Sequence, residues 1–244
     1  MLSVVIPAYN EERRIVSCLQ EVARFLHARP DAFEVIIVDD GSTDSTVEKA
    51  TGFAARDPRF AVLSHGSNRG KGAALRTGIA ATRGNRVLLT DADLSTPLDE
   101  LPLLEQPLDE GAIVAIGSRG LPASRLVRRQ SRLRELAGRG GNLLIRLLCP
   151  ELHGIRDTQC GFKLFDGPSV RELCRWSTLV GFGFDVELLL LARRRKLPVR
   201  EIPVTWAHHD GSKVTGRAYV ATLFEVVRVR INLAAGRYPH GPDS

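Results

Sequence analysis

Short, continuously apolar runs alternate with longer amphipathic stretches along the first third of the chain. The apolar runs cover residues 2–7, 33–38, 60–63 and 86–89, and helical patterns cover 11–27, 45–55 and 71–82. Strands that are apolar on both faces and separated by helices are typical of a parallel sheet covered on both sides. The sequence therefore predicts an α/β fold with a mostly parallel central sheet flanked by helices.

The second half of the chain is less regular but continues the same fold class. We expect strands over 113–117 and 199–206, and helices over 131–148, 185–195 and 219–233. No repeat or linker divides the chain, and 244 residues, 43% of them hydrophobic, suit one core. We therefore expect a single domain over residues 1–238, followed by a flexible tail over 239–244.

The composition narrows the expected location and partners. The four cysteines lack CxxC or zinc spacing, so we expect reduced thiols in a cytoplasmic protein. Neither a signal peptide nor an apolar run near the ~18 residues of a membrane-spanning helix is visible, so we expect a soluble or peripheral protein. The net charge of +6 fits nucleic acid, anionic lipid or a phosphorylated substrate. Only 6% of the residues are aromatic, which argues against nucleic-acid binding by base stacking.

Polar residues gather where three of the predicted strands end. They are Tyr9, Asn10 and Glu11 after the first strand, Asp39, Asp40 and Gly41 after the second, and Asp91, Ala92 and Asp93 after the fourth. Open parallel sheets bind their ligands beyond the carboxyl ends of the strands. The sequence therefore predicts a binding site at this edge of the sheet.

Asp91 and Asp93 are the sharpest feature of that edge. Two carboxylates leaving a strand can reach one hard cation, and Mg²⁺ or Mn²⁺ prefers such oxygen ligands while keeping positions open for phosphate oxygens. Such a metal would neutralise charge developing on a departing nucleoside diphosphate. On its own the triplet would favour a solvated turn. Its position after an apolar strand, level with two other polar strand ends, reverses that preference.

Other polar segments keep two interpretations open. Asp39 and Asp40 could accept hydrogen bonds from a base or a ribose, or belong to a turn in which Asp44 caps the next helix. The glycines around Lys71 could favour anion binding at a helix start or only permit close packing, and we weigh these equally. Residues 157–163 could form a simple turn, and the carboxylates within 182–187 suit a helix start, so the residues alone assign neither segment a catalytic role.

Six sequence motifs follow one another in order between Ser3 and about Tyr238. They are VIPAYNE (5–11), VDDGSTD (38–44), NRGKG (68–72), DAD (91–93), IRDTQCGFK (155–163) and GSK (211–213). Together they resemble the family 2 glycosyltransferases of GT-A fold, in particular the dolichyl-phosphate or polyprenyl-phosphate glucosyltransferases. The resemblance implies a nucleotide-binding half over residues 1–95 and an acceptor-binding half over 96–238.

The resemblance also implies roles for individual residues. The nucleotide-sugar site would comprise Pro7, Tyr9, Asn10, Glu11, Val38, Asp39, Asp40, Gly41, Lys71, Arg76, Ala92 and Lys213. Asp91 and Asp93 would bind Mg²⁺ or Mn²⁺. The catalytic set would be Asp93, Arg119 near the donor sugar, Arg134 near the acceptor phosphate, Gln159 at the sugar, and Asp185 as a weak candidate for a general base.

Two departures from related mannose synthases favour the glucosyl type and UDP-glucose. Ser95 stands where a glutamine often assists the metal, and Ala207 stands where an arginine precedes the lysine of the donor site. A third protein ligand for the metal is therefore left open. The N-terminal membrane anchor usual in the glucosyl enzymes is not seen at the start of this sequence.

The implied reaction is inverting sugar transfer to a polyprenyl or dolichyl phosphate. The acceptor phosphate is already an anion, so positioning and charge neutralisation become the main tasks. An arginine cluster between 125 and 139 could rest on anionic headgroups at the cytoplasmic membrane face, whereas helix 219–233 reads equally as a core helix. The alternatives are another donor, such as GDP-mannose or UDP-GlcNAc, a soluble acceptor, and a nucleotide-sugar-binding module without turnover.

Overall fold

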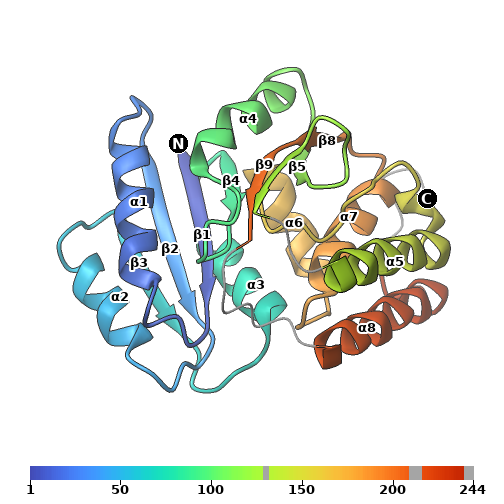
Figure 1. Ribbon diagram of the computed structural model, residues 1–244, viewed down its shortest axis with the longest axis horizontal. Helices are drawn as coiled ribbons and strands as arrows, with labels where there is room; N and C mark the ends of the chain where they lie inside the picture. The colour runs from blue at the N-terminus through green and yellow to red at the C-terminus, as the bar shows by residue number, and fades with distance from the viewer. Residues whose placement is uncertain (129–131, 209–215, 239–244) are drawn as a thin grey trace.

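A seven-stranded sheet with helices on both faces forms the body of the protein (Figure 1). The structure, a computed structural model, describes residues 1–128, 132–208 and 216–238. The strand order is β3-β2-β1-β4-β7-β5-β8, and β6 and β9 form a separate pair. The strands are β1 (Leu2–Ala8), β2 (Phe33–Asp39), β3 (Phe60–Ser64), β4 (Arg86–Leu89), β5 (Val114–Ser118), β6 (Arg125–Arg128), β7 (Lys163–Asp166), β8 (Val199–Pro203) and β9 (Thr205–Ala207).

Helices cover the sheet on both sides and add an outer layer at one end (Figure 1). They are α1 (Ile15–His27), α2 (Thr46–Ala54), α3 (Lys71–Ala81), α4 (Leu101–Asp109), α5 (Arg132–Leu148), α6 (Gly167–Trp176), α7 (Phe184–Arg194) and α8 (Gly216–Ala234). Short 3-10 turns lie at Leu98–Glu100 and Pro150–Leu152. Among the described residues, no helix combines the length and the apolar composition that crossing a membrane would need.

The two largest cores lie on opposite faces of the sheet because successive strand residues point to opposite sides. On one face, Val4 and Ile6 of β1 pack with residues of α1 and α4. On the other, Val5 packs with residues of α3, α6 and α7, and this core continues into the inner sides of α5 and α8. All four cysteines are free thiols and are buried. The all-apolar strands therefore reflect burial on both faces, as the sequence predicted.

The sheet is parallel apart from β7, which runs antiparallel to both β4 and β5. This reversal brings the first residue of β7, Lys163, beside Leu89 at the carboxyl end of β4 and beside Ile116 of β5. Lys163 therefore lies at the same edge of the sheet as the polar strand ends. The prediction of a mostly parallel sheet is confirmed, but strands β6 and β7 and helices α4 and α6 were not predicted.

Two predicted elements differ from the structure. The expected strand 199–206 is wrong as one element, because β8 ends at Pro203 and β9 begins at Thr205 in the other sheet. Proline has no N–H to donate to a ladder, which suits it to a strand end. The predicted helix 11–27 begins later, at Ile15. Asn10 takes a left-handed φ of 52°, and residues 11–14 form a turn before the helix.

Candidate active site

The carboxyl ends of β1, β2 and β4 meet at one edge of the sheet. Ala8 of β1 is the register partner of Asp39 in β2, and the N–H of Thr90, just after β4, donates to the carbonyl of Val5 at 3.1 Å. The three polar segments predicted from the sequence are therefore brought together. They surround the position where a ligand of an open α/β sheet binds.

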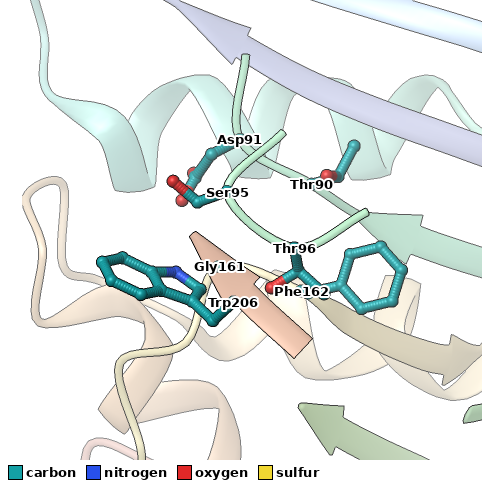
Figure 2. Close-up of a pocket in the computed structure, with 7 residues that line it drawn as sticks. All are labelled: Thr90, Asp91, Ser95, Thr96, Gly161, Phe162 and Trp206. Atoms are coloured by element: carbon teal, nitrogen blue, oxygen red, sulfur yellow. The ribbon is translucent and has the colours of Figure 1, made fainter. Parts of the chain in front are cut away.

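A tight turn presents the two aspartates after β4. Leu94 has a left-handed φ of 46°, its N–H donates to the carbonyl of Asp91 at 3.0 Å, and the N–H of Ser95 donates to Oδ1 of Asp93 at 2.9 Å. Asp91, Ser95, Gly161 and Trp206 are among the residues that line a small pocket here (Figure 2). The side chains of Asp91 and Ser95 lie close together on one wall (Figure 2). Ala92 itself is buried.

Lys71, the first residue of α3, holds Asp91. Its Nζ lies 2.6 Å from Oδ1 of Asp91, and the two side chains are 19% and 37% exposed. Burial raises the pKa of Asp91, but the neighbouring Lys71 lowers it by a larger amount. The pKa of Asp91 therefore lies below its ordinary value. Asp91 is therefore a carboxylate at neutral pH, paired with a cation.

The start of α3 is fixed by a close approach to residues 177–183. A Cβ added at Gly70 or Gly72 would collide with the backbone of Val180 or Gly181, and Gly70 also has a φ of 103°. The N–H of Ala73 donates to the carbonyl of Val180 at 3.0 Å. The glycines thus permit close packing, and that packing aims Lys71 at Asp91. The close-packing interpretation of this motif is confirmed, and anion binding at this helix start stays a prediction.

Arg119 forms a bidentate pair with Asp157. Its Nε and Nη2 lie 2.6 and 2.8 Å from the two carboxylate oxygens, and its backbone N–H donates at 3.0 Å. The guanidinium also lies 5.6 Å from the ring centre of Trp206. Burial raises the pKa of Asp157, but Arg119 more than offsets this and takes it to about 2. The predicted donor-sugar arginine is therefore rigidly held at the pocket.

Replacing Asp157 with asparagine should lower the free energy of unfolding by about 3 kcal/mol near neutral pH, because one partner of a buried pair is lost. The carboxylate's pKa falls from its ordinary 3.8 to about 2 on folding, so its stabilisation is present above pH 3.8 and disappears as pH falls through 2. Urea unfolding of both proteins from pH 7 to pH 2 should therefore show converging stabilities.

Asp31→Asn is the matched control for this change. Asp31 makes a surface pair with Arg29 at 3.4 Å and its side chain is 62% exposed, so this variant should change stability by less than about 0.5 kcal/mol. A gap between wild type and Asp157→Asn that stayed constant down to pH 2 would contradict the ionic origin of the stabilisation.

Lys163 and Asp185 form a second buried ion pair at this edge. Nζ of Lys163 lies 2.5 Å from Oδ1 of Asp185 and also donates to the carbonyl of Cys160. Both residues are less than a tenth exposed. Asp185 is thus tied to an ammonium, and its action as a general base stays a prediction. Gln159 lies nearby and donates from Nε2 to the carbonyl of Phe182 at 3.4 Å.

Asp39 and Asp40 are buried and build the loops at the edge. Asp39 accepts hydrogen bonds from the N–H groups of Gly41 and Ser42. Asp40 accepts from Nδ1 of His65 at 2.8 Å and from the N–H groups of Arg69 and Gly70 at 3.0 and 2.7 Å. Asp40 therefore fixes the loop that leads into Lys71, and a direct contact of either aspartate with a nucleotide stays a prediction.

The remaining predicted residues are distributed around this edge. Pro7, Tyr9 and Glu11 are partly exposed, and the side chain of Asn10 accepts from the N–H of Thr43 at 2.8 Å. Val38 is fully buried in a core with Ile36 and Ala74. Arg76 donates to the carbonyls of Ser177 and Leu179. Lys213 lies outside the described residues, and so does the side chain of Arg134.

Four residues in or beside the pocket, Asp157, Gly161, Lys163 and Trp206, received no role from the sequence. Three of them belong to motif 155–163. The sequence showed this motif in its place among the others, but it did not show what these three residues contact. Gly161 is the most constrained, because a Cβ there would overlap the carboxylate of Asp91. Only the fold brings Gly161 against a residue seventy positions earlier.

Comparison with known proteins agrees with this geometry. Residues 3–166 match the family described as glycosyl transferase family 2. The chain belongs to glycosyl transferase family 2. It is 40% identical over 229 residues to dolichyl-phosphate beta-glucosyltransferase of Drosophila melanogaster, covering 88% of this chain and 69% of that protein. It is 37% identical to the Homo sapiens protein of the same name, over 87% of this chain and 69% of that one.

The solved structures support the fold of this glycosyltransferase. Glucosyl-3-phosphoglycerate synthase from Mycobacterium tuberculosis, in complex with UDP, matches 100% of this chain and 82% of its own with a TM-score of 0.70 and 24% identity. The predicted GT-A fold is thereby confirmed. The prediction of a family 2 glycosyltransferase, made from ordered motifs, is confirmed as well.

Proposed function

We propose that this glycosyltransferase moves glucose from UDP-glucose onto a polyprenyl or dolichyl phosphate with inversion at the anomeric carbon. The observation that carries this proposal is 34–40% identity over 87–96% of the chain to proteins named dolichyl-phosphate beta-glucosyltransferase. Residues 1–95 would bind the donor and 96–238 the acceptor. A lipid-phosphate acceptor also requires contact with a membrane surface.

A divalent metal fits Asp91 and Asp93. The ammonium of Lys71 pairs with Asp91, so the fold accommodates a positive charge beside that carboxylate. Within the described part of the chain, no cluster of three or more histidine, cysteine or acidic residues could hold a metal. Two carboxylates alone would leave positions free for diphosphate oxygens, as Mg²⁺ and Mn²⁺ prefer. When bound, the metal would neutralise charge on the leaving UDP.

Positioning and charge are the contributions of the chain itself. Arg119 is held bidentately by Asp157 and offers a fixed positive charge at the pocket, while Trp206 provides an apolar surface beside it. Lys71 supplies a second positive charge at Asp91. The acceptor phosphate is an anion near neutral pH, so attack on the sugar needs no strong base. This suits a site whose nearby carboxylate, Asp185, is engaged by Lys163.

The test is transfer of radiolabelled glucose from UDP-glucose to detergent-solubilised dolichyl phosphate, measured as organic-extractable product. We expect product with Mn²⁺ or Mg²⁺ and none with EDTA. Asp93→Asn should lower the rate at least about a hundredfold, because several kcal/mol of charge stabilisation is lost. Asp99→Asn, an exposed aspartate in the turn before α4, is the matched control.

Parallel reactions separate the alternatives. Structural neighbours of this fold were crystallised with Mn²⁺, UDP-glucose and phosphoglyceric acid, so 3-phosphoglycerate is the soluble acceptor to compare. Water-soluble product alone would show that the acceptor is soluble and not a lipid phosphate. Product with GDP-mannose but not UDP-glucose would overturn the donor. Binding of the donor without any sugar transfer would show that the protein is a nucleotide-sugar-binding module without turnover.

A further inference from the structure

Residues 177–183 join α6 to α7, and we call this segment the 177–183 loop. Three of its carbonyl groups accept hydrogen bonds from α3. The carbonyl of Val180 accepts from the N–H of Ala73 at 3.0 Å. The carbonyls of Ser177 and Leu179 accept from the guanidinium of Arg76 at 3.0 and 3.4 Å. The loop is therefore the surface on which the start of α3 rests.

Glu187 of α7 fixes the first half of the loop. It is fully buried and accepts hydrogen bonds from the N–H groups of Thr178 and Leu179, each at 2.9 Å. The hydroxyl groups of Thr178 and Tyr238 also donate to it. Because removing a buried acceptor leaves all of its donors unsatisfied, a change of Glu187 would destabilise the whole fold. Its role is therefore structural.

Glu225 fixes the second half of the loop from α8, in the outer layer of helices (Figure 1). Its two oxygens accept hydrogen bonds from the N–H groups of Gly181 and Gly183 at 2.8 and 2.7 Å. A Cβ added at Gly181 would lie 2.6 Å from Oε1 of Glu225, so the carboxylate rests directly on the backbone of the loop. Glu225 is only partly buried, and it is the one acidic residue in the sequence of α8.

The half of the loop that Glu225 holds reaches two residues of the candidate site. Val180 and Phe182 flank Gly181, and the carbonyl of Phe182 accepts from Nε2 of Gln159 at 3.4 Å. The carbonyl of Val180 accepts from α3, whose first residue is Lys71. A shift of this half of the loop would therefore change the support of both Lys71 and Gln159.

We propose that Glu225 is a positioning residue for the donor site, because it fixes through the 177–183 loop where Lys71 and Gln159 stand. The inference rests on the proposed function, in which Lys71 lies beside the donor diphosphate. The connection to Lys71 is short: Glu225 bonds to Gly181, and the preceding carbonyl bonds to α3. Misplacement of a binding group by about 1 Å is enough to change catalysis strongly.

Hydrogen exchange without added ligand tests whether the loop transmits a change at Glu225 to α3. In Glu225→Gln the side-chain amide accepts through one oxygen only, so one of the two bonded N–H groups loses its acceptor. We expect exchange about tenfold faster at Gly181 and Gly183, and also at Ala73, whose acceptor is on the loop. Faster exchange in the loop with unchanged exchange at Ala73 would overturn the proposal.

Binding of UDP at saturating Mn²⁺ tests whether this positioning matters for the donor. UDP lacks the sugar, so its affinity reports on Lys71 and not on Gln159. The Kd of Glu225→Gln should rise about three- to tenfold, because Lys71 is displaced but still present. In a Lys71→Met background the same change should have no further effect, since both act on one contact. Additive effects of the two changes would overturn the proposal.

Glu151→Gln is the matched control. Glu151 also contacts α8 through a carboxylate, which lies 2.8 Å from Nη1 of Arg230. This variant should keep the wild-type exchange at Ala73 and the wild-type Kd for UDP. Glu225→Asp keeps the charge and both acceptor oxygens, so it should retain more UDP affinity than Glu225→Gln. Equal loss of affinity in Glu151→Gln and Glu225→Gln would overturn the proposal, because any weakening of α8 would then have the same effect.

Transfer assays keep this inference separate from the proposed function. Weaker UDP binding by Glu225→Gln, with no glucosyl transfer by the wild-type chain, would support the positioning role and remove the proposed reaction. Glucosyl transfer with the same KM for UDP-glucose in both proteins would leave the reaction standing and remove the positioning role. A wild-type chain that does not bind UDP at all would overturn both.

Discussion

Gly161→Ala is expected to lower kcat/KM for glucosyl transfer about a hundredfold while the protein stays folded. The added Cβ would overlap the carboxylate of Asp91. The backbone cannot yield easily, because the flanking residues Cys160 and Phe162 are each 1% exposed. Asp91 would have to turn away from the position in which we propose that it binds the metal, and a misplacement of about 1 Å in a catalytic group can cost about a hundredfold in rate.

The measurement compares initial rates and metal dependence of Gly161→Ala and wild type. Gly52→Ala is the matched control, because Gly52 lies in α2 and a Cβ there meets no atom within 4 Å. That variant should keep its activity and gain about 0.5–1 kcal/mol of stability, as glycine is a poor helix former. Full activity of Gly161→Ala at the wild-type metal concentration would show that Asp91 need not occupy its observed position.

The four parallel strands of the first half were predictable because burial on both faces leaves an unbroken apolar run. Their predicted bounds differ from the observed ones by no more than one residue at either end. The reversed strand β7 has only four residues, Lys163–Asp166, with a charge at each end. Nothing local distinguishes such a segment from a turn. Its direction is decided by pairing with β4 and β5, which the sequence does not display.

The residues of the candidate site also differ in how far the sequence could predict them. Asp91 and Asp93 were recognisable because they directly follow a strand, and the ordered motifs gave the family. The partner of Arg119 was not, since Asp157 follows it by 38 residues and the two meet only in the folded chain. The dense fixing of Asp40 by His65 and by backbone N–H groups was equally invisible. The sequence thus predicted which polar strand ends share one edge of the sheet, while the contacts that make this edge rigid needed the structure.

Lys71→Met should change metal binding and donor binding in opposite directions. The ammonium of Lys71 lies 2.6 Å from Oδ1 of Asp91, so a cation that binds this oxygen would compete with it. Removing it should tighten Mn²⁺ binding about tenfold or less, the order of a partly exposed ion pair of ~1 kcal/mol. The same change removes a positive charge beside the expected diphosphate position. The KM for UDP-glucose should therefore rise at least about tenfold, since charge-assisted bonds contribute about 1.5–3 kcal/mol.

Thermal-shift titration with Mn²⁺ alone measures the first effect, and initial rates at saturating Mn²⁺ measure the second. Lys49→Met is the matched control, because Lys49 is an exposed lysine of α2 that donates to the carbonyl of Glu12, away from Asp91. It removes the same charge and should leave both quantities unchanged. Weaker binding of both ligands, together with a lower melting temperature, would instead assign Lys71 a structural role. Opposite signs follow only if one lysine both competes with the metal for Asp91 and attracts the diphosphate.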